Sequence, residues 1–351
     1  MGIAANVAPS QSIPVTISKS SVRISALDFT KGALVLIMVL YHWLNYFCDL
    51  HDNRYLRFLT PSFIFITGFL ISNVYFAKYD VSDPQLRRRL MDRGLKILGT
   101  FIALNVIIAV LFAGFRAAGP LLAHLIATSA MPVFVTGNVA VAGVGRGVAF
   151  YILVPIAYLL ILSSALCSLG KFFRYGFYVA CACGLLGILA LRLNGAESSN
   201  LELLTIGLLG VIVGYFPISQ INALVRHPLL LAAAYAGYIV AITFWNVIYP
   251  LQVVGVCLSL MILYLLGGQG DEKGRLQSRI ILLGKYSLFG YISQIAILQV
   301  LRRAFRYTDL GPAVLTVSFV LAIVLTVLSV EAVNSARRHS TADKVYRWVF
   351  A

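Results

Sequence analysis

Long apolar runs separated by short polar links dominate this chain of 351 residues. A run of about 20 apolar residues crosses the hydrocarbon core of a bilayer, about 30 Å thick, as a helix. Most of the runs end in charged residues, Pro or Gly, which commonly mark the ends of helices. The pattern predicts ten membrane spans, at residues 32–50, 59–76, 97–115, 148–169, 175–191, 201–218, 228–248, 250–267, 280–301 and 311–333.

Residues 119–137 form a further apolar stretch, which contains His124 and Pro132. This stretch is either an eleventh span or a re-entrant or interfacial helix. An eleventh span would invert every later helix and place the basic C-terminal segment outside. With ten spans and a cytoplasmic N-terminus, 20 of the 28 Lys and Arg residues face the cytoplasm, as the positive-inside rule expects. We therefore expect ten spans and two cytoplasmic termini.

The composition agrees with a single membrane domain. Hydrophobic residues make up 60% of the chain and charged residues 12%, with a mean hydropathy of +0.88, whereas soluble domains carry about 25% charged residues. The expected fold class is all-α, a polytopic integral membrane bundle of about ten helices over residues 23–336. Residues 1–22 lack the basic start and apolar core of a signal peptide, so we expect a disordered cytoplasmic tail there. We expect residues 337–351 to form a basic cytoplasmic tail.

The net charge of +15 follows from membrane topology, because the basic residues cluster in the links between apolar runs. No nucleic-acid partner is expected. Almost all of the five cysteines lie within apolar runs, and no Cys or His pair has metal-ligand spacing. We expect neither a metal site nor a disulfide framework.

The first apolar run carries a candidate catalytic pair, Lys31 and His42. Eleven helical residues rotate through three turns plus about 20° and rise about 16 Å, so both side chains share one face. His42 then lies about 15 Å from the membrane edge, near the midplane. Ionisable groups at that depth face a bundle interior or a wet cavity and indicate function. His42 is either a general base or a histidine that hydrogen-bonds a neighbouring helix.

Other polar residues flank this pair. Asn45 and Asp49 continue the same face toward the outer side, where they offer a path for a hydroxylated acceptor. Asp28 either complements the positive end of the helix or takes part in catalysis. Lys31 either anchors the helix at the lipid interface or orients an anionic or carbonyl group below His42.

A basic cluster lies in the link 78–96, and its arginines include Arg88, Arg89 and Arg93. Arg89 and Arg93 are four residues apart and share a helical face. The cluster is either a solvated cytoplasmic link or a phosphate-binding entrance for a nucleotide-bearing donor. On the second interpretation, Arg88, Arg89 and Arg93 bind the donor.

Three segments resemble the membrane-bound acyltransferase-3 family of transmembrane acyltransferases, which is related to the heparan-type acetyltransferases. Arg23-x-x-x-Leu27-Asp28-x-x-Lys31-Gly32, followed by His42, resembles its opening pattern R-x-x-x-L-D-x-x-R-G and His. Pro61–Ser72 resembles its F-F-x-x-S-G-F-L-I segment, and Leu283–Tyr291 its late L-G-x-x-S-x-x-x-Y segment. The chain departs from the family at two positions: Lys31 replaces an Arg, and Gln294 stands where the late motif often has His.

The resemblance implies an integral-membrane O-acyltransferase. It would move a short acyl group, expected to be acetyl, from acyl-CoA to a cell-surface glycan or glycolipid in the bacterial inner membrane, without a metal. His42 would be the base, Lys31 would orient the donor or acceptor, and Ser287 and Tyr291 would line the cavity. The alternatives are a transporter or flippase of a lipid-linked sugar that uses the same cavity, and a regulatory membrane protein with a degenerate site.

Overall fold

The computed structural model of the protein describes residues 25–50, 53–81, 83–138, 150–245, 247–269, 274–305 and 311–350. Within these ranges the regular structure consists of helices, without a strand, so the expected all-α fold is confirmed. The predicted tail at residues 1–22 and Arg23 of the opening motif lie outside the described residues.

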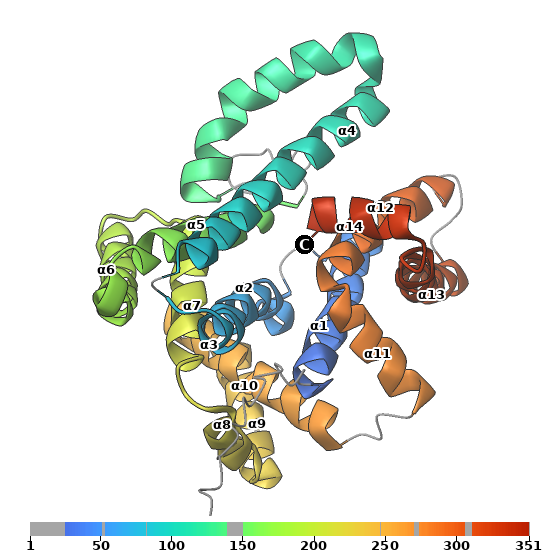
Figure 1. Ribbon diagram of the computed structural model, residues 1–351. Helices are drawn as coiled ribbons and strands as arrows, with labels where there is room; N and C mark the ends of the chain where they lie inside the picture. The colour runs from blue at the N-terminus through green and yellow to red at the C-terminus, as the bar shows by residue number, and fades with distance from the viewer. Residues whose placement is uncertain are drawn as a thin grey trace, which may run out of the picture.

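Fourteen α-helices and four short 3₁₀- or π-helical turns make up these described ranges (Figure 1). Their bounds are α1 Ser25–Phe47, η1 Arg54–Leu56, α2 Leu59–Leu70, η2 Ile71–Tyr75, α3 Phe76–Lys78, α4 Pro84–Ala130, η3 Met131–Thr136, α5 Leu153–Cys167, η4 Gly170–Phe172, α6 Phe173–Leu193, α7 Ser199–Val213, α8 Ile218–Val225, α9 Pro228–Phe244, α10 Tyr249–Gln269, α11 Arg275–Lys285, α12 Ser287–Ala304, α13 Pro312–Ala336 and α14 Ser340–Phe350.

The described residues contain five helical segments long and apolar enough to cross a membrane: α1, Arg54–Lys78, Gly170–Leu193, α10 and α13. Two bent pairs raise this number to as many as seven, α7 with α8 at 101° and α11 with α12 at 95°. The shorter helices α5 and α9 are also apolar. These segments confirm the integral membrane bundle but not the predicted count of ten.

Up to Thr136, the stretch 119–137 belongs to the end of the long helix α4 and to the π-turn η3. Residues 84–130 form one continuous helix, which is followed by η3, so this stretch begins inside α4 and not as a separate helix. Forty-seven helical residues measure about 70 Å, more than twice the hydrocarbon thickness. Gly119-Pro120 lies within the helix, and an interior proline bends a helix. Figure 1 shows α4 leaving the body of the bundle and curving back.

Two glycine contacts bring helices together backbone to backbone. A Cβ added to Gly32 of α1 would lie 1.8 Å from the carbonyl oxygen of Ile280, and one added to Gly284 of α11 would lie 1.6 Å from that of Asp28. Both glycines belong to the family-like motifs, although they are about 250 residues apart. Apolar side chains gain little by moving from lipid to protein, so membrane helices associate through close backbone packing at small residues. The two motifs therefore meet at one helix crossing.

A second crossing joins α2 to α7. A Cβ on Gly68 would lie 2.0 Å from the carbonyl oxygen of Gly207, and one on Gly210 would lie 2.2 Å from that of Phe65. Gly68 belongs to the segment Pro61–Ser72 that the sequence singled out. The two crossings fix α1, α2 and α11 around the cavity described next.

Candidate active site

A cavity of about 200 Å³ lies where the motif segments converge. Its polar lining comes from α1, α2, η2, α4, the α11–α12 bend and α14, and consists of Lys31, Thr67, Tyr75, Arg93, Lys285, Tyr286, Ser287 and Tyr291, together with Tyr346. Four of the predicted site residues thus line one cavity: Lys31, Arg93, Ser287 and Tyr291. The bend between α11 and α12 contributes three basic or hydroxyl groups in succession, Lys285 to Ser287.

Lys31 is held by Asp28 on the same helix. The Lys31 ammonium lies 2.6 Å from the Asp28 carboxylate, and these side chains are 17% and 8% exposed. Asp28 also lies in the first turn of α1, where its charge complements the helix dipole. The spacing D-x-x-K therefore fixes the direction of the Lys31 side chain where it meets the cavity.

The three predicted donor-binding arginines have different surroundings. Arg93 lines the cavity and hydrogen-bonds the Tyr75 hydroxyl. Arg89 hydrogen-bonds the Tyr79 hydroxyl, and its guanidinium lies 4.8 Å from the centre of that ring. Arg88 is 85% exposed and lies 3.7 Å from Asp92. Of the three, Arg93 is the one that reaches the cavity.

Tyr75 lies at the end of a π-helical turn. It is the last residue of the π-turn η2, which begins at Ile71, within the last two residues of the motif Pro61–Ser72. Single π-turns within helices frequently occur at functional sites. Ile71 and Tyr75, the two ends of this turn, both line the cavity.

His42 lies beside the cavity next to Tyr291. The ring centroids of His42 and Tyr291 are 6.3 Å apart, and Tyr41 approaches the imidazole edge-on at 5.3 Å. The His42 Nε2 atom is buried and has no hydrogen-bond partner in the described part of the chain. Tyr291, which is 8% exposed, therefore connects the cavity to His42.

Helices α1 and α12 carry further buried polar atoms without a partner in the described residues. Helix α12 runs beside α1, and the Gln299 amide donates to the Tyr46 hydroxyl at 3.3 Å. On α12, Gln294 is fully buried, and neither its amide nitrogen nor its oxygen has a partner within the described ranges. The Asn45 Oδ1 atom is likewise buried and unpaired there. Such atoms are rare in native structures and indicate groups that a ligand or water satisfies. Asp49 lies beyond α1 and is exposed.

Sequence reasoning missed five polar residues of the cavity wall: Thr67, Tyr75, Lys285, Tyr286 and Tyr346. Lys285 and Tyr286 stand inside the late motif, so their position was a usable signal. Tyr75 follows the second motif by three residues. Tyr346 lies in the segment expected to be a tail, and no local pattern connects it to the cavity.

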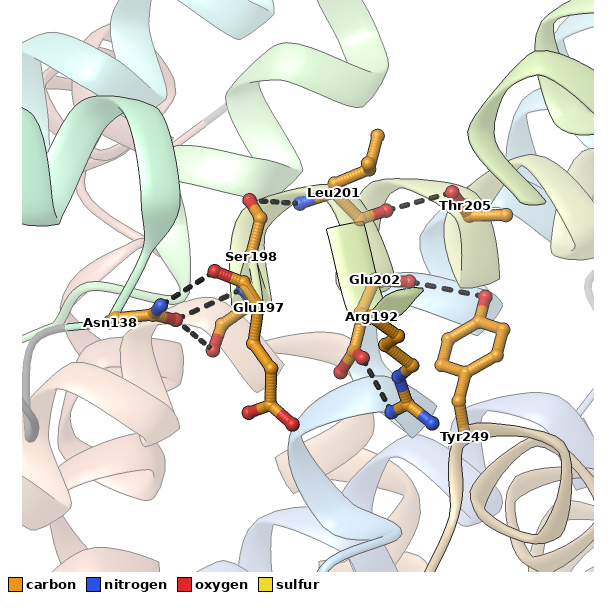
Figure 2. Close-up of polar contacts among 9 residues, drawn as sticks. Asn138, Arg192, Glu197, Ser198, Leu201, Glu202, Thr205 and Tyr249 are labelled. Carbon is orange, nitrogen blue, oxygen red and sulfur yellow. Dashed lines mark hydrogen bonds and ion pairs between the residues drawn. The ribbon is translucent and has the colours of Figure 1, made fainter. Parts of the chain in front are cut away.

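A polar network elsewhere in the bundle joins other helices (Figure 2). Arg192 at the end of α6 pairs with Glu202 of α7 at 2.8 Å, and the Tyr249 hydroxyl donates to the Glu202 carbonyl at 3.4 Å. The Asn138 amide donates to the Glu197 carbonyl at 2.7 Å. None of these residues lines the cavity, and the network connects α6, α7, α10 and the chain after η3.

A larger cavity, about 270 Å³, lies between α1, α2, α7, α8 and α10. Its lining is almost entirely aliphatic, aromatic or sulfur-containing, with Thr30 and Tyr264 as its hydroxyl groups. It holds no cation for a phosphate and no base for a hydroxyl proton. The described residues also contain no group of three His, Cys, Asp or Glu side chains that would hold a metal.

The comparison with protein families decides the class. A family model for the acyltransferase-3 domain matches residues 24–331, which is most of the chain. The chain belongs to the acyltransferase-3 family. No curated protein and no solved structure matched it. Together with the apolar helices, membership of this family makes the protein a membrane acyltransferase and does not favour the transporter alternative.

Proposed function

We propose that this acyltransferase moves a short acyl group, acetyl, from acyl-CoA to a hydroxyl of a cell-surface glycan or glycolipid. One observation carries the proposal. One cavity is lined by three basic side chains from separate parts of the chain, Lys31, Arg93 and Lys285. Tyr291, in the wall of the same cavity, lies next to His42. Three cations in one cavity suit a polyanionic donor, because phosphate oxygens require charged hydrogen-bond donors.

The size of the cavity limits which part of the donor it takes. Sites for whole drug-sized ligands measure about 300–1,000 Å³, whereas this cavity measures about 200 Å³. We therefore place the acyl end and its thioester arm inside, and the phosphates against the cations Lys31, Arg93 and Lys285. The nucleotide would lie outside the cavity, along the exposed face of α4 that carries Arg88 and Arg89.

His42 is the proposed base. Its unpaired Nε2 atom would take the proton of the acceptor hydroxyl as the hydroxyl oxygen attacks the acyl carbonyl. The carbon–sulfur bond then breaks, and the CoA thiolate leaves. Lys31, directed by Asp28, would orient the donor below His42. Asn45 and Asp49 extend from His42 toward the far end of α1, which we propose as the acceptor path.

The arrangement of the two ends of the chain supports the proposed orientation. Lys31 near the start of α1 and Tyr346 of α14 line the same cavity, so these two parts of the chain lie at one end of the bundle. This agrees with two cytoplasmic termini in a bacterial inner membrane. It also agrees with a cytoplasmic donor, because acyl-CoA is made in the cytoplasm and would enter from that end. The lipid bilayer is the immediate partner.

Replacement of His42 tests the reaction. Purified protein in nanodiscs would be given acetyl-CoA labelled in the acetyl group together with membrane-derived glycans, and acetylated glycans would be measured by mass spectrometry. We expect transfer by the natural protein and loss of transfer, by about a hundredfold or more, in His42→Ala, since general-base catalysis contributes about 10²–10⁴. The control is His227→Ala, an exposed histidine before α9. Normal turnover in a folded His42→Ala protein would remove His42 from the mechanism.

A further inference from the structure

Helix α14 lies outside the matched family domain and yet forms part of the cavity wall. The family match ends at residue 331, and α14 spans Ser340–Phe350. Tyr346 of this helix lines the cavity beside Tyr286 and Arg93. Helix α14, drawn in red in Figure 1, also packs against α4. A segment beyond the family domain therefore helps to shape the site.

An ionic clamp fixes α14 where it leaves α13. The Arg337 Nε–H donates to the Asp343 carboxylate at 2.7 Å, and the Arg337 Nη2 atom lies 2.6 Å from the same carboxylate. Arg347, one turn further along α14, approaches the other oxygen of Asp343 at 2.7 Å. Both Arg337 contacts go to Oδ1 of Asp343 and Arg347 contacts Oδ2, so charge-assisted contacts hold both carboxylate oxygens. The clamp thus determines how the helix turns after α13.

The clamp also positions the aromatic wall. The Arg337 guanidinium lies 4.3 Å from the centre of the Tyr346 ring and 5.4 Å from that of Tyr286. The two tyrosine rings meet edge to face at 5.4 Å, and the Tyr286 hydroxyl donates to Asn334 at 2.9 Å. Tyr286 stands at the α11–α12 bend, directly between Lys285 and Ser287 of the cavity. One guanidinium therefore connects α14 to the motif residues.

We propose that α14 is a strap that closes the donor cavity, and that Tyr346 is a donor-binding residue that the strap supplies. The donor assignment rests on the function proposed above. The ring of Tyr346 closes the wall that faces Arg93 and Lys285, and the contact of Arg337 with Asp343 holds the ring in place. Donor affinity then depends on a helix that the matched family domain does not include.

Closure of the cavity by α14 can be tested with a thiol label, a measurement that does not require acyl transfer. Ile156 of α5 lines the cavity, so the thiol of Ile156→Cys reports access to it. Full-length protein in nanodiscs would be treated with a water-soluble maleimide, and labelling of this peptide followed by mass spectrometry. We expect Tyr346→Ala to speed labelling at least about threefold, and Tyr346→Phe, which keeps the ring, to label at the original rate. Lys344→Ala, an exposed change on the same helix, is the matched control.

Two measurements separate the closure of the cavity by α14 from the role of Tyr346 in donor binding: the KM for acetyl-CoA, and the protection of Ile156→Cys from maleimide by acetyl-CoA. The KM for acetyl-CoA should rise roughly three- to tenfold in Tyr346→Ala, the size of one aromatic contact, with kcat unchanged. Acetyl-CoA should protect Ile156→Cys from the maleimide. Equal labelling rates in folded Tyr346→Ala and Tyr346→Phe proteins would overturn the strap. Faster labelling in Tyr346→Ala without protection by acetyl-CoA would overturn the donor role of Tyr346 and of the cavity, leaving a strap over a different ligand.

Discussion

Two glutamines of α12, Gln294 and Gln299, differ in whether their side-chain amides are hydrogen-bonded. Gln294 is fully buried, and both of its amide atoms lack a partner among the residues described. On the same helix, the Gln299 amide does have a partner, the Tyr46 hydroxyl. An unpaired buried polar group costs about 1–3 kcal/mol of folding free energy, whereas a paired group does not carry that cost. The stability cost at Gln294 is consistent with a role in binding the acyl carbonyl or the acceptor.

We predict that Gln294→Leu stabilises the protein and slows the reaction. Removal of the unpaired amide should raise the free energy of unfolding by about 1 kcal/mol or more, while acyl transfer falls about tenfold through loss of a positioning contact. Gln299→Leu breaks an existing hydrogen bond and should lower stability. Thermal unfolding in nanodiscs and transfer assays would measure both. A destabilised Gln294→Leu protein with full activity would contradict the prediction.

At the scale of helices, close backbone approach determines the architecture of the site. The crossing of α1 and α11 through Gly32 and Gly284 sets Lys31 beside Lys285 and Ser287. The atoms that a new Cβ would meet there are backbone atoms, which cannot turn aside as a flexible side chain can. The motif glycines are therefore structural requirements of the cavity.

We predict that Gly284→Ala separates α1 from α11. The new Cβ would lie 1.6 Å from the Asp28 carbonyl oxygen. Overpacking of this kind costs about 1–3 kcal/mol or more, so unfolding should occur at lower temperature and acetyl-CoA binding should weaken. Gly237→Ala in α9 is the matched control, because no atom lies within 4 Å of its added Cβ. Equal unfolding temperatures for Gly284→Ala and the natural protein would refute the crossing.

The ion pairs of α14 give a prediction about pH. The Arg337 guanidinium, which hydrogen-bonds the carboxylate, lowers the pKa of Asp343 below its ordinary value. The interaction is therefore complete above that ordinary value, about 4, and is lost as the pH falls through the lowered pKa. Burial raises the pKa of Tyr346 to about 12, so its ring stays neutral on the alkaline side. The remaining charged groups at the clamp, Arg337 and Arg347, stay protonated throughout.

We expect α14 to stay docked from about pH 5 to about pH 9 and to loosen below about pH 4. A spin label on Lys344→Cys, an exposed position of α14, would report the mobility of the helix by electron paramagnetic resonance. The same label in an Asp343→Asn protein is the control and should be mobile at every pH. A transition above about pH 5 would contradict the assignment of the loosening to Asp343.

At the scale of the whole molecule, positive charge gathers at the cavity. Its wall carries Lys31, Arg93 and Lys285, and the clamp of α14 adds Arg337 nearby. Such a concentration of positive charge attracts anions and raises their association rate in a way that salt reduces. The cavity would thus attract the phosphate-bearing donor that we propose.

We predict that Arg93→Gln weakens acetyl-CoA binding about ten- to a hundredfold, because hydrogen bonds from charged groups contribute about 1.5–3 kcal/mol. Arg226→Gln is the matched control, since Arg226 is exposed after α8 and does not line the cavity. Its effect should stay within about twofold, as is usual for an exposed charge. Calorimetric titration at about 0.1 and 1 M salt would measure both, and salt should weaken binding to the natural protein. Equal losses in the two variants would indicate general attraction by positive charge and not a contact with Arg93.

The pattern of residues along the chain was sufficient to predict the all-helical membrane fold. It also predicted a family that the family comparison confirmed. These features are local, because a bilayer selects each span by its own length and apolarity, and helical spacing follows from a few neighbouring residues. The number of spans was less well predicted. Bent pairs such as α11 and α12 and the long α4 depart from the rule of one apolar run for one straight helix.

Other features depend on segments far apart in the sequence. Three neighbouring arginines look equivalent in the chain, but the packing of α4 against its neighbours brings Arg93 to the cavity and leaves Arg88 exposed. Tyr346 also lines the cavity, although it lies on a helix beyond the family domain, and the Arg337 guanidinium lies against its ring. Gln294 lies on α12, which packs against α1, and its buried amide finds no partner in the described residues. Such contacts are set by how closely backbones approach and at what angle helices cross, which no local pattern of apolar and polar residues encodes.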